Sequence, residues 1–206
     1  MLAGAGSIDP FGAILNSATG GVEPTGTVTE NRVSDMVDLY EEATAWRRTV
    51  EAENPIVYRV VAAPVPEEAG EVPFSITTIE AGTVGDEFFM TKGHAHTSYQ
   101  GELYVGLSGR GLLLLYDGDE ARYVEIFPDR AGYIPPGWAH RTVNVGDEPF
   151  RFLAVYPGDA GHDYGFVARK GMGVRVRRAP EGYEVRTAVG GVGSVAGEQA
   201  ERERSV

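Results

Sequence analysis

The sequence contains no cysteine, and only two tryptophans and four histidines among its 206 residues. Without cysteine, the protein cannot use a catalytic thiol, an iron–sulfur cluster or a zinc site made of thiolates. The lack of disulfides fits a reducing compartment, and a chain of this length can bury a core that needs none. Any metal site must therefore be made of histidine and carboxylate side chains.

Basic residues are also scarce, since 18 Lys and Arg stand against 30 Asp and Glu, for a formal net charge of −12. This acidic balance argues against nucleic acid or an anionic membrane as a partner. No apolar run is long enough to span a membrane. The first residues carry no basic segment of the kind that opens a signal peptide, and Asp9-Pro10 comes early. We therefore expect a cytoplasmic protein.

Glycine is abundant, with 28 residues, and 12 prolines accompany it. From residue 56 to residue 156, short β-like runs alternate with turn signals such as Pro135-Pro136-Gly137. Strands spaced this closely are typical of an antiparallel sandwich or barrel, so we predict an all-β fold. One helix is expected over Arg32–Val50, where apolar residues recur at helical spacing, and one more hairpin at 174–187.

The same patterns divide the chain into three parts. Residues 1–31 are rich in Gly, Ala, Thr and Pro and predict a short irregular N-terminal arm. Residues 32–187 hold the helix and the strand-like runs, and predict a single domain. Residues 188–206 are Gly-rich and then charged, which predicts a flexible tail.

Four residues form the constellation that carries chemistry. His94 and His96 stand two residues apart, so on a strand both side chains point to the same face. Glu102 opens the next strand after a short connection, and His140 begins a later one. A tight hairpin and a closed or nearly closed sheet would bring all four together. Three imidazoles and one carboxylate suit a divalent first-row metal, and on an octahedral ion they leave two positions for water or substrate.

The joint spacing of these residues resembles the two signature motifs of the cupin superfamily. The motifs are His94-x-His96, Glu102 and Gly109, and then Pro135-x-Gly137-x-x-His140-x-x-x-Asn144. Two glycines expected in them are Phe88 and Asp129 here, at strand-end turns rather than at ligands. Three longer runs are similar to the cupin-type phosphoglucose isomerases: TKGHAH at 91–96, PPGWAHRTVN at 135–144 and AVYPGDAGHDYG at 154–165. The similarity spans residues 32–187.

This resemblance implies a jelly-roll-like cupin β-barrel, a homodimer and one divalent metal ion per subunit. Fe²⁺ is the expected ion, with Zn²⁺, Mn²⁺, Ni²⁺ or Co²⁺ as alternatives. It also implies interconversion of glucose 6-phosphate and fructose 6-phosphate, a step of glycolysis and gluconeogenesis. The substrate would be a phosphosugar, held by hydroxyls and a backbone N–H rather than by a basic patch.

Carried over residue by residue, the resemblance assigns a role to each part of the site. The metal ligands would be His94, His96, Glu102 and His140. Phosphate would be held by Tyr58, Thr77, Thr91 and Gly93, and the sugar chain would be contacted by Tyr104, Tyr156, His162 and Tyr164. Lys92 is an additional candidate for phosphate, although alternation along a strand favours an outward direction for it.

The implied reaction is an aldose–ketose isomerisation. His162 is the candidate for the proton transfers that open the sugar ring, and Glu102 is the favoured base that moves a proton from C2 to C1 through a cis-enediolate. A hydride shift from C2 to C1 is the rival route, and the sequence does not choose between them. Three other functions stay open: isomerisation of mannose 6-phosphate, a metal-dependent cupin dioxygenase, and a non-enzymatic cupin that binds sugar.

Overall fold

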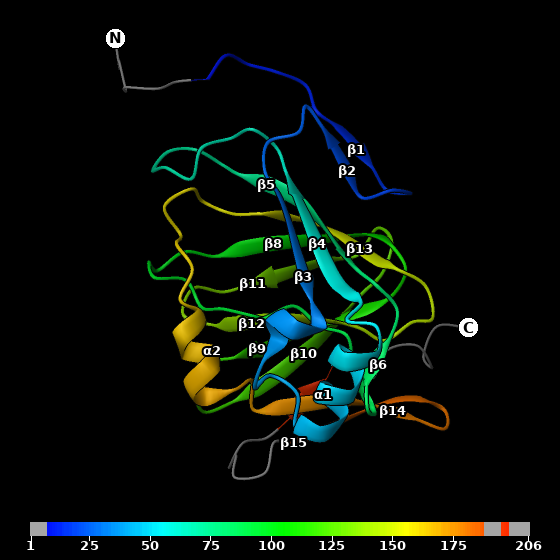
Figure 1. The fold of residues 1–206 in the computed structure, drawn as a ribbon. Helices are drawn as coiled ribbons and strands as arrows, with labels where there is room; N and C mark the ends of the chain where they lie inside the picture. The colour runs from blue at the N-terminus through cyan, green and yellow to red at the C-terminus, as the bar shows by residue number, and fades with distance from the viewer. Residues whose placement is uncertain (1–7, 188–194, 198–206) are drawn as a thin grey trace, which may run out of the picture.

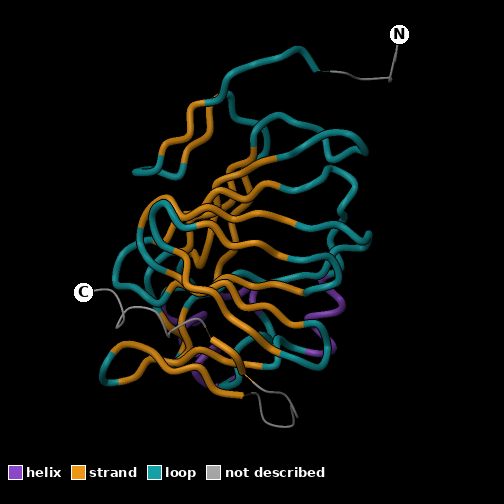
Figure 2. The backbone as a smooth tube through the Cα atoms, turned by 180° about the vertical axis from the view of Figure 1, so that it is seen from behind, coloured by secondary structure: helices purple, strands orange, loops and turns teal. Residues whose placement is uncertain are grey.

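The structure is a computed structural model that describes residues 8–187 and 195–197. Its strands fall into four open sheets. The N-terminal hairpin lies at one end of the molecule, and both α-helices lie at the other (Figure 1). The same arrangement is seen from behind in Figure 2, where the strands run side by side between the two ends.

The largest sheet carries most of the molecule and has six strands, all paired antiparallel, in the order β11-β8-β13-β5-β4-β3. Strand β13 pairs with both β5 and β8. Both of these strands come much earlier in the sequence than β13, so long connections join strands that are neighbours in the sheet. The strands are β3 (Val28–Arg32), β4 (Ile56–Ala62), β5 (Phe74–Ile79), β8 (Glu102–Ser108), β11 (Ala131–Ile134) and β13 (Phe150–Val155).

Three smaller sheets complete the fold. The first has the order β12-β9-β10-β16, the second β15-β14-β7-β6, and the third is the hairpin β1-β2. Their strands are β1 (Ile14–Asn16), β2 (Gly21–Glu23), β6 (Thr83–Val84), β7 (Glu87–Phe88), β9 (Gly111–Tyr116), β10 (Ala121–Ile126), β12 (Ala139–Asn144), β14 (Val174–Ala179), β15 (Gly182–Thr187) and β16 (Val195–Gly197).

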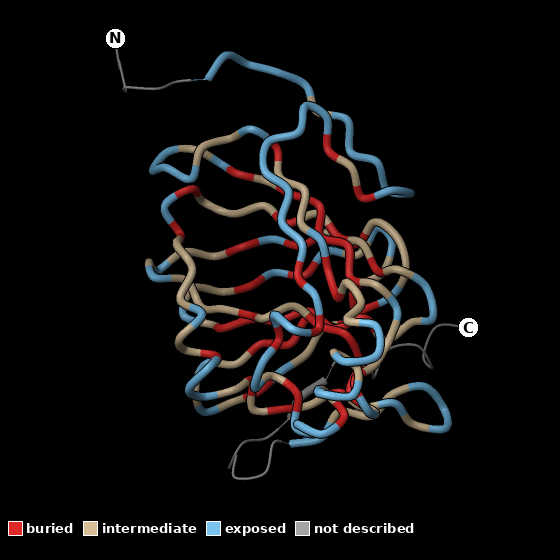
Figure 3. The backbone as a smooth tube through the Cα atoms, in the orientation of Figure 1, coloured by how far each residue is buried: buried red, intermediate tan, exposed pale blue. Residues whose placement is uncertain are grey.

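The core lies where the sheets face each other. Strand β9 contributes four consecutive leucines, 112–115, and all are buried because the strand sits between β12 and β10 and is covered on both faces. Strand β13 instead alternates buried and half-buried residues, so that Phe150 and Phe152 enter the core. Figure 3 shows the buried stretches concentrated in the central strands, while the N-terminal segment is exposed over much of its length.

The predicted all-β class and the predicted hairpin at 174–187 are both confirmed. The sheets do not, however, close into one continuous hydrogen-bonded barrel in the described part of the chain. They pack against each other as open sheets, and the connection across the site is made by isolated bridges such as His94 with His140. The predicted all-β, jelly-roll-like fold is therefore confirmed, with sheets that stay open.

The prediction of a single helix over Arg32–Val50 is wrong in two respects. The helix starts later than predicted, and the described residues contain a second helix. Arg32 ends β3, a short 3-10 turn η1 (Val33–Met36) follows, and Asp38 adopts a φ of 62°, which a helix cannot continue through. Helix α1 (Ala43–Ala52) begins only after that loop. No helix in the described residues is long and apolar enough to cross a membrane.

A second helix, α2 (Tyr164–Lys170), was not predicted. Asp163 caps it, because its side chain accepts a hydrogen bond of 3.2 Å from the backbone N–H of Phe166. The sequence signal is weak, since Gly165 lies in the first turn and only seven residues are helical. Helix α2 begins two residues after His162, one of the candidate site residues.

The expected irregular arm, residues 1–31, contains three short strands. Hairpin β1–β2 projects from the body, and β3 joins the large sheet beside β4. Strand β3 was not predicted, because it contains the polar residues Thr29 and Asn31 and therefore lacks the apolar pattern by which the other strands were predicted. The expected flexible tail, 188–206, lies outside the described residues except for Val195–Gly197, which pair in parallel with β10.

Candidate metal and substrate site

One cavity of about 650 Å³ opens between the large sheet and the segments at 91–94 and 156–164. Eleven of the twelve residues expected at the site line it; the twelfth, His96, is not among the lining residues, and its side chain is only 4% exposed. The lining set is Tyr58, Thr77, Thr91, Gly93, His94, Glu102, Tyr104, His140, Tyr156, His162 and Tyr164.

Backbone pairing places His94 beside His140. The N–H of His140 donates to the carbonyl of His94 at 2.8 Å, and the N–H of His94 donates back at 3.1 Å. Ala95 pairs in the same way with Asp163, which brings in the chain that carries His162. The expectation of a regular strand at His94 and His96 is wrong, because this segment forms isolated bridges only, but both side chains still reach the cluster.

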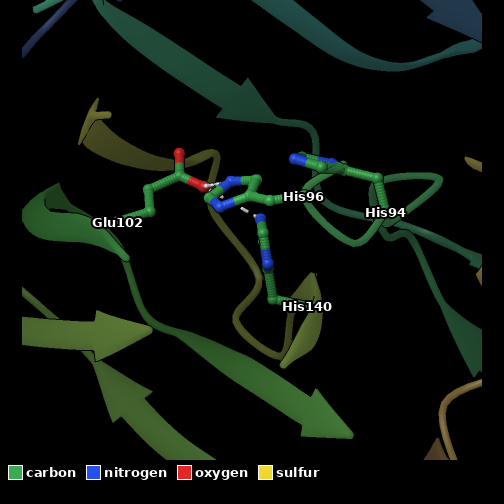
Figure 4. A group of neighbouring side chains, drawn as sticks. All are labelled: His94, His96, Glu102 and His140. Carbon is green, nitrogen blue, oxygen red and sulfur yellow. Dashed lines mark hydrogen bonds and ion pairs between the residues drawn. The ribbon is translucent and has the colours of Figure 1, made fainter. Parts of the chain in front are cut away.

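Four side chains gather in and beside the cavity wall, and one ligand atom from each lies within 4.8 Å of all the others: His94, His96, Glu102 and His140. Glu102 is the first residue of β8 and is 5% exposed. Its Oε2 atom lies 3.2 Å from Nε2 of His96 and 2.9 Å from Nε2 of His140 (Figure 4). Spacing in the sequence therefore predicted this cluster correctly.

The hydrogen bonds around the cluster show which nitrogens are free to bind a cation. Nδ1 of His96 lies 2.8 Å from the carbonyl oxygen of Gln100, and Nδ1 of His140 lies 3.4 Å from that of Trp138. A carbonyl only accepts, so each Nδ1 carries the proton and each Nε2 presents a lone pair. Both lone pairs face the carboxylate of Glu102, which is also an acceptor.

Such facing acceptors repel one another unless a cation or a proton lies between them. In addition, Nε2 of His94 is buried and has no hydrogen-bond partner among the described residues, and Nε2 of His140 makes no well-aligned hydrogen bond despite its short distance to Glu102. A buried polar atom without a partner is costly, and a metal ion would satisfy all of these atoms at once. The residues present thus fit a divalent metal ion.

Burial and mutual contact set the charges of this cluster. Burial lowers the pKa of His94 to about 2, so its imidazole is neutral at physiological pH and able to act as a ligand. Burial alone raises the pKa of Glu102, but the facing imidazoles of His140 and His96 outweigh it and hold that pKa at about 2. Glu102 as a carboxylate and His94 as a neutral imidazole are thus in the protonation states in which these side chains bind a divalent metal.

Another part of the cavity wall is lined by hydroxyls and by the loop Thr91-Lys92-Gly93, which directly precedes His94. The Oγ1 atom of Thr91 accepts a hydrogen bond of 3.1 Å from the backbone N–H of Thr142, which leaves its own O–H free to donate. Gly93 adopts a φ of 73°. Lys92 is among the lining residues as well, and the outward direction of its side chain stays a prediction.

Three tyrosines and His162 also line the cavity. The His162 ring is 4.5 Å from that of His94 and 5.7 Å from that of Tyr156, measured between centroids. Burial raises the pKa values of Tyr104, Tyr156 and Tyr164, so their hydroxyls stay protonated and can donate hydrogen bonds. Burial also lowers the pKa of His162.

Several lining residues were missed by the sequence reasoning. Glu67, in the loop after β4, accepts a hydrogen bond of 2.9 Å from the Tyr156 hydroxyl. Three more lining residues are Thr27, Thr29 and Asn31, which lie on strand β3 or just before it. They were not considered because this segment was predicted to be an irregular arm. Their period of two was a usable signal, because alternating polar residues on a strand share one face. No comparable signal marked Glu67.

Comparison with known proteins adds the decisive observation. The profile of the glucose-6-phosphate isomerase family matches residues 30–189. The chain belongs to the glucose-6-phosphate isomerase family. Its glucose-6-phosphate isomerase relatives include those of Thermococcus litoralis, 46% identical over 80% of this chain and 87% of the relative, and Pyrococcus furiosus, with the same identity and coverage. That of Thermococcus onnurineus is 41% identical over 86% of this chain and 93% of the relative.

The family match begins and ends within two residues of the span that the motifs predicted, 32–187, and contains every predicted site residue. Hairpin β1–β2 falls outside it. Among solved structures, a mutant oxalate decarboxylase of Bacillus subtilis aligns with a TM-score of 0.41 and 23% identity, over 51% of this chain and 27% of that one. Membership of the isomerase family rests on the sequence matches.

Proposed function

We propose that this protein interconverts glucose 6-phosphate and fructose 6-phosphate, with one divalent metal ion held by His94, His96, Glu102 and His140. The observation that carries the proposal is the cluster of facing acceptor atoms beside a cavity lined with hydroxyls. Its family relatives carry the name of this activity. Residues 32–187 would form the single domain that performs it.

The metal requirement follows from the donor set. When bound, the ion supplies a Lewis acid that polarises the oxygens at C1 and C2 of the open-chain sugar. We propose Fe²⁺ as the resident ion, with Zn²⁺, Mn²⁺, Ni²⁺ and Co²⁺ as alternatives, because imidazole and carboxylate donors accept all of them. Metal analysis of the protein purified from its own source would identify it.

The hydroxyl-lined end would hold the phosphate, through Tyr58, Thr77, Thr91 and the N–H of Gly93. Hydroxyl and amide donors bind an anion without a basic patch, which reconciles a doubly charged substrate with a protein of net charge −12. Tyr104, Tyr156 and Tyr164 would contact the sugar chain between the phosphate and the metal ligands. The cavity volume of about 650 Å³ accommodates a hexose phosphate.

The proton transfers fall to two residues. His162 would donate and accept the protons that open the ring. Glu102 would take the proton from C2 and return it to C1, while the hydroxyl proton moves from O2 to O1, so that an aldose becomes a ketose without gain or loss of atoms. A carboxylate with a low pKa is a weak base, so this role requires a C2–H that polarisation of the neighbouring carbonyl has made acidic.

Replacement of Gly93 by alanine tests the phosphate loop. An added Cβ would lie 2.9 Å from the His140 carbonyl oxygen and 3.0 Å from Cβ of Arg141, at a φ that disfavours any side chain. We expect KM for fructose 6-phosphate to rise and the free energy of unfolding to fall by about 1–2 kcal/mol. Gly171→Ala is the control, because Gly171 has a φ of 68° and no atom near its added Cβ. An equal rise of KM in both variants would contradict the assignment.

Replacement of His162 by asparagine tests its proton-transfer role. Asparagine keeps a polar side chain of similar reach but cannot exchange a proton near neutral pH. We expect metal content to stay unchanged and kcat to fall by about 10²-fold. Supplying substrate already enriched in the open-chain form should recover part of the rate. Loss of metal from the variant would instead make His162 a ligand.

A coupled assay tests the proposed activity. Protein reconstituted with metal is given fructose 6-phosphate, and glucose 6-phosphate is detected by its oxidation with a second enzyme. Turnover is the expected result, and no turnover with metal bound would refute the proposal. The same preparation given mannose 6-phosphate measures the rival sugar specificity, and oxygen uptake during incubation would indicate a dioxygenase. Sugar binding without any turnover would indicate a non-enzymatic cupin.

The protein would act as a homodimer in the cytoplasm. Apolar side chains on and beside the N-terminal hairpin are exposed, among them Ile14 at 67%, Val28 at 55% and Phe11 at 41%. Exposed apolar side chains of this kind suit contact with a second copy of the chain. Light scattering after size exclusion should give twice the mass of the chain, and deletion of residues 1–25 should reduce it to one.

A further inference from the structure

Arg141 is a buried arginine directly behind the loop that lines the phosphate end of the cavity. It follows His140 on β12 and is only 7% exposed. Its Nε and Nη2 atoms donate to the carbonyl oxygen of Lys92 at 3.2 and 2.7 Å. The guanidinium does not line the substrate cavity; it borders a second cavity of about 560 Å³ on the other side of the loop.

The charge of Arg141 is not neutralised by a salt bridge with any carboxylate among the described residues. Glu87, the acid that borders the same second cavity, is already paired with Arg175 at 2.7 Å. A guanidinium stays protonated in proteins, so the side chain is a cation at neutral pH. A buried cation without a salt-bridge partner is costly, and a bound anion nearby would offset that cost.

The hydrogen bonds of Arg141 fix the direction of a peptide group. The Lys92 carbonyl and the Gly93 N–H belong to one trans peptide unit, in which C=O and N–H point in opposite directions. Because the carbonyl points at Arg141, the Gly93 N–H points away from it, toward the substrate cavity. This N–H has no backbone acceptor among the described residues, so it is available to a ligand.

Gly93 also packs directly on the arginine, since an added Cβ would come within 3.0 Å of Cβ and 3.2 Å of Nε of Arg141. The guanidinium is therefore separated from the phosphate end of the cavity by the thickness of one peptide. In this buried setting, a positive charge at that distance is screened less than it would be in water.

We propose that Arg141 is a positioning residue for the substrate phosphate, which aims the Gly93 N–H into the cavity and places a compensating positive charge behind it. The proposal deepens the proposed function and rests on it. It explains how an acidic protein binds a dianion although no arginine lines the cavity.

The test compares Arg141→Gln, Arg141→Lys and the control Arg186→Gln, which removes an arginine that is 61% exposed on β15. Loss of a charge-assisted hydrogen bond predicts that KM for fructose 6-phosphate rises by about 10–100-fold in Arg141→Gln. The kcat should change by less than about threefold, because the guanidinium does not line the cavity in which the substrate would react. Arg141→Lys should fall in between, and the control should match the unaltered protein.

Two inhibitors that differ only in a phosphate separate this role from general distortion of the site. The inhibition constant of 6-phosphogluconate should rise with KM, while that of gluconate should stay unchanged. Equal weakening of both inhibitors, or a fall of kcat with KM unchanged, would overturn the proposal. Metal content of each variant confirms that His140, the preceding residue, still binds.

A measurement on the unaltered protein covers the case in which the variants do not fold. Protein loaded with Zn²⁺, which is diamagnetic, is titrated with inorganic phosphate while the amide resonances are followed by NMR. A downfield shift of the Gly93 amide proton is expected, and a Gly93 amide that does not respond while phosphate binds would overturn the proposal. Because this experiment needs no turnover, failure of the isomerase assay and failure of the Arg141 role are distinguishable.

Discussion

Replacement of His140 by alanine is expected to remove the metal ion and the isomerase activity together. His140 is 1% exposed, and its backbone pairs with His94, so it fixes two ligands at once. Three remaining ligands would bind a divalent ion more weakly, and loss of a Lewis acid that contributes several kcal/mol lowers kcat by about 10³-fold or more. Metal analysis and the coupled assay on the same sample measure both effects.

His162→Asn is the matched control, because it removes another histidine of the same cavity that is not among the proposed ligands. Unfolding of His140→Ala and of the unaltered protein should be compared without metal, so that the loss of a buried side chain is separated from the loss of the ion. A His140→Ala variant that keeps its metal but loses activity would show that His140 is not a ligand.

Replacement of Glu102 by glutamine is expected to lower kcat by about 10²–10⁴-fold, the range for removal of a general base. Glutamine has the same shape, and its amide oxygen can still bind metal, so part of the metal should remain. Glu67→Gln makes the same change to a second carboxylate of the cavity, one that contacts Tyr156 rather than the ligand cluster. We expect that variant to lose about tenfold or less.

Substrate labelled with deuterium at C2 tests the route that Glu102 serves. Transfer of a proton through an enediolate lets the label exchange with solvent, so the product should contain less deuterium than the substrate. The Glu102→Gln variant should show slower exchange in step with its slower turnover. Full retention of the label would favour the hydride shift and would remove Glu102 from the role of base.

The metal cluster could be predicted from the sequence because most of its residues lie close together in the chain. His94, His96 and Glu102 lie within nine residues, and motif spacing alone brings them together. His140 is distant, but the run that follows Pro135 marks it as the start of a strand. The prediction held even though the segment at 94–96 is not a regular strand, because the bridges to His140 and Asp163 replace the strand pairing.

The sequence failed where long-range contacts decide the structure. Apolar periodicity indicated a helix from Arg32, but Met36 and Tyr40 are buried by a 3-10 turn and a loop that pack on the core. Glu67 lies in a loop with no pattern of its own, and only the fold brings it to Tyr156. Arg141 reads as an ordinary residue beside a ligand, since the direction of the Lys92 carbonyl is a property of the folded backbone.

Titration of metal-free protein with a divalent ion tests the central claim most directly. Isomerase activity and bound metal are measured at each addition, with Fe²⁺ kept anaerobic and Mn²⁺ and Zn²⁺ in parallel. The four-ligand site predicts that activity rises in proportion to bound metal and reaches its maximum at one ion per chain. Full activity of the metal-free protein, or activity that continues to rise beyond one ion per chain, would contradict a single metal centre at His94, His96, Glu102 and His140.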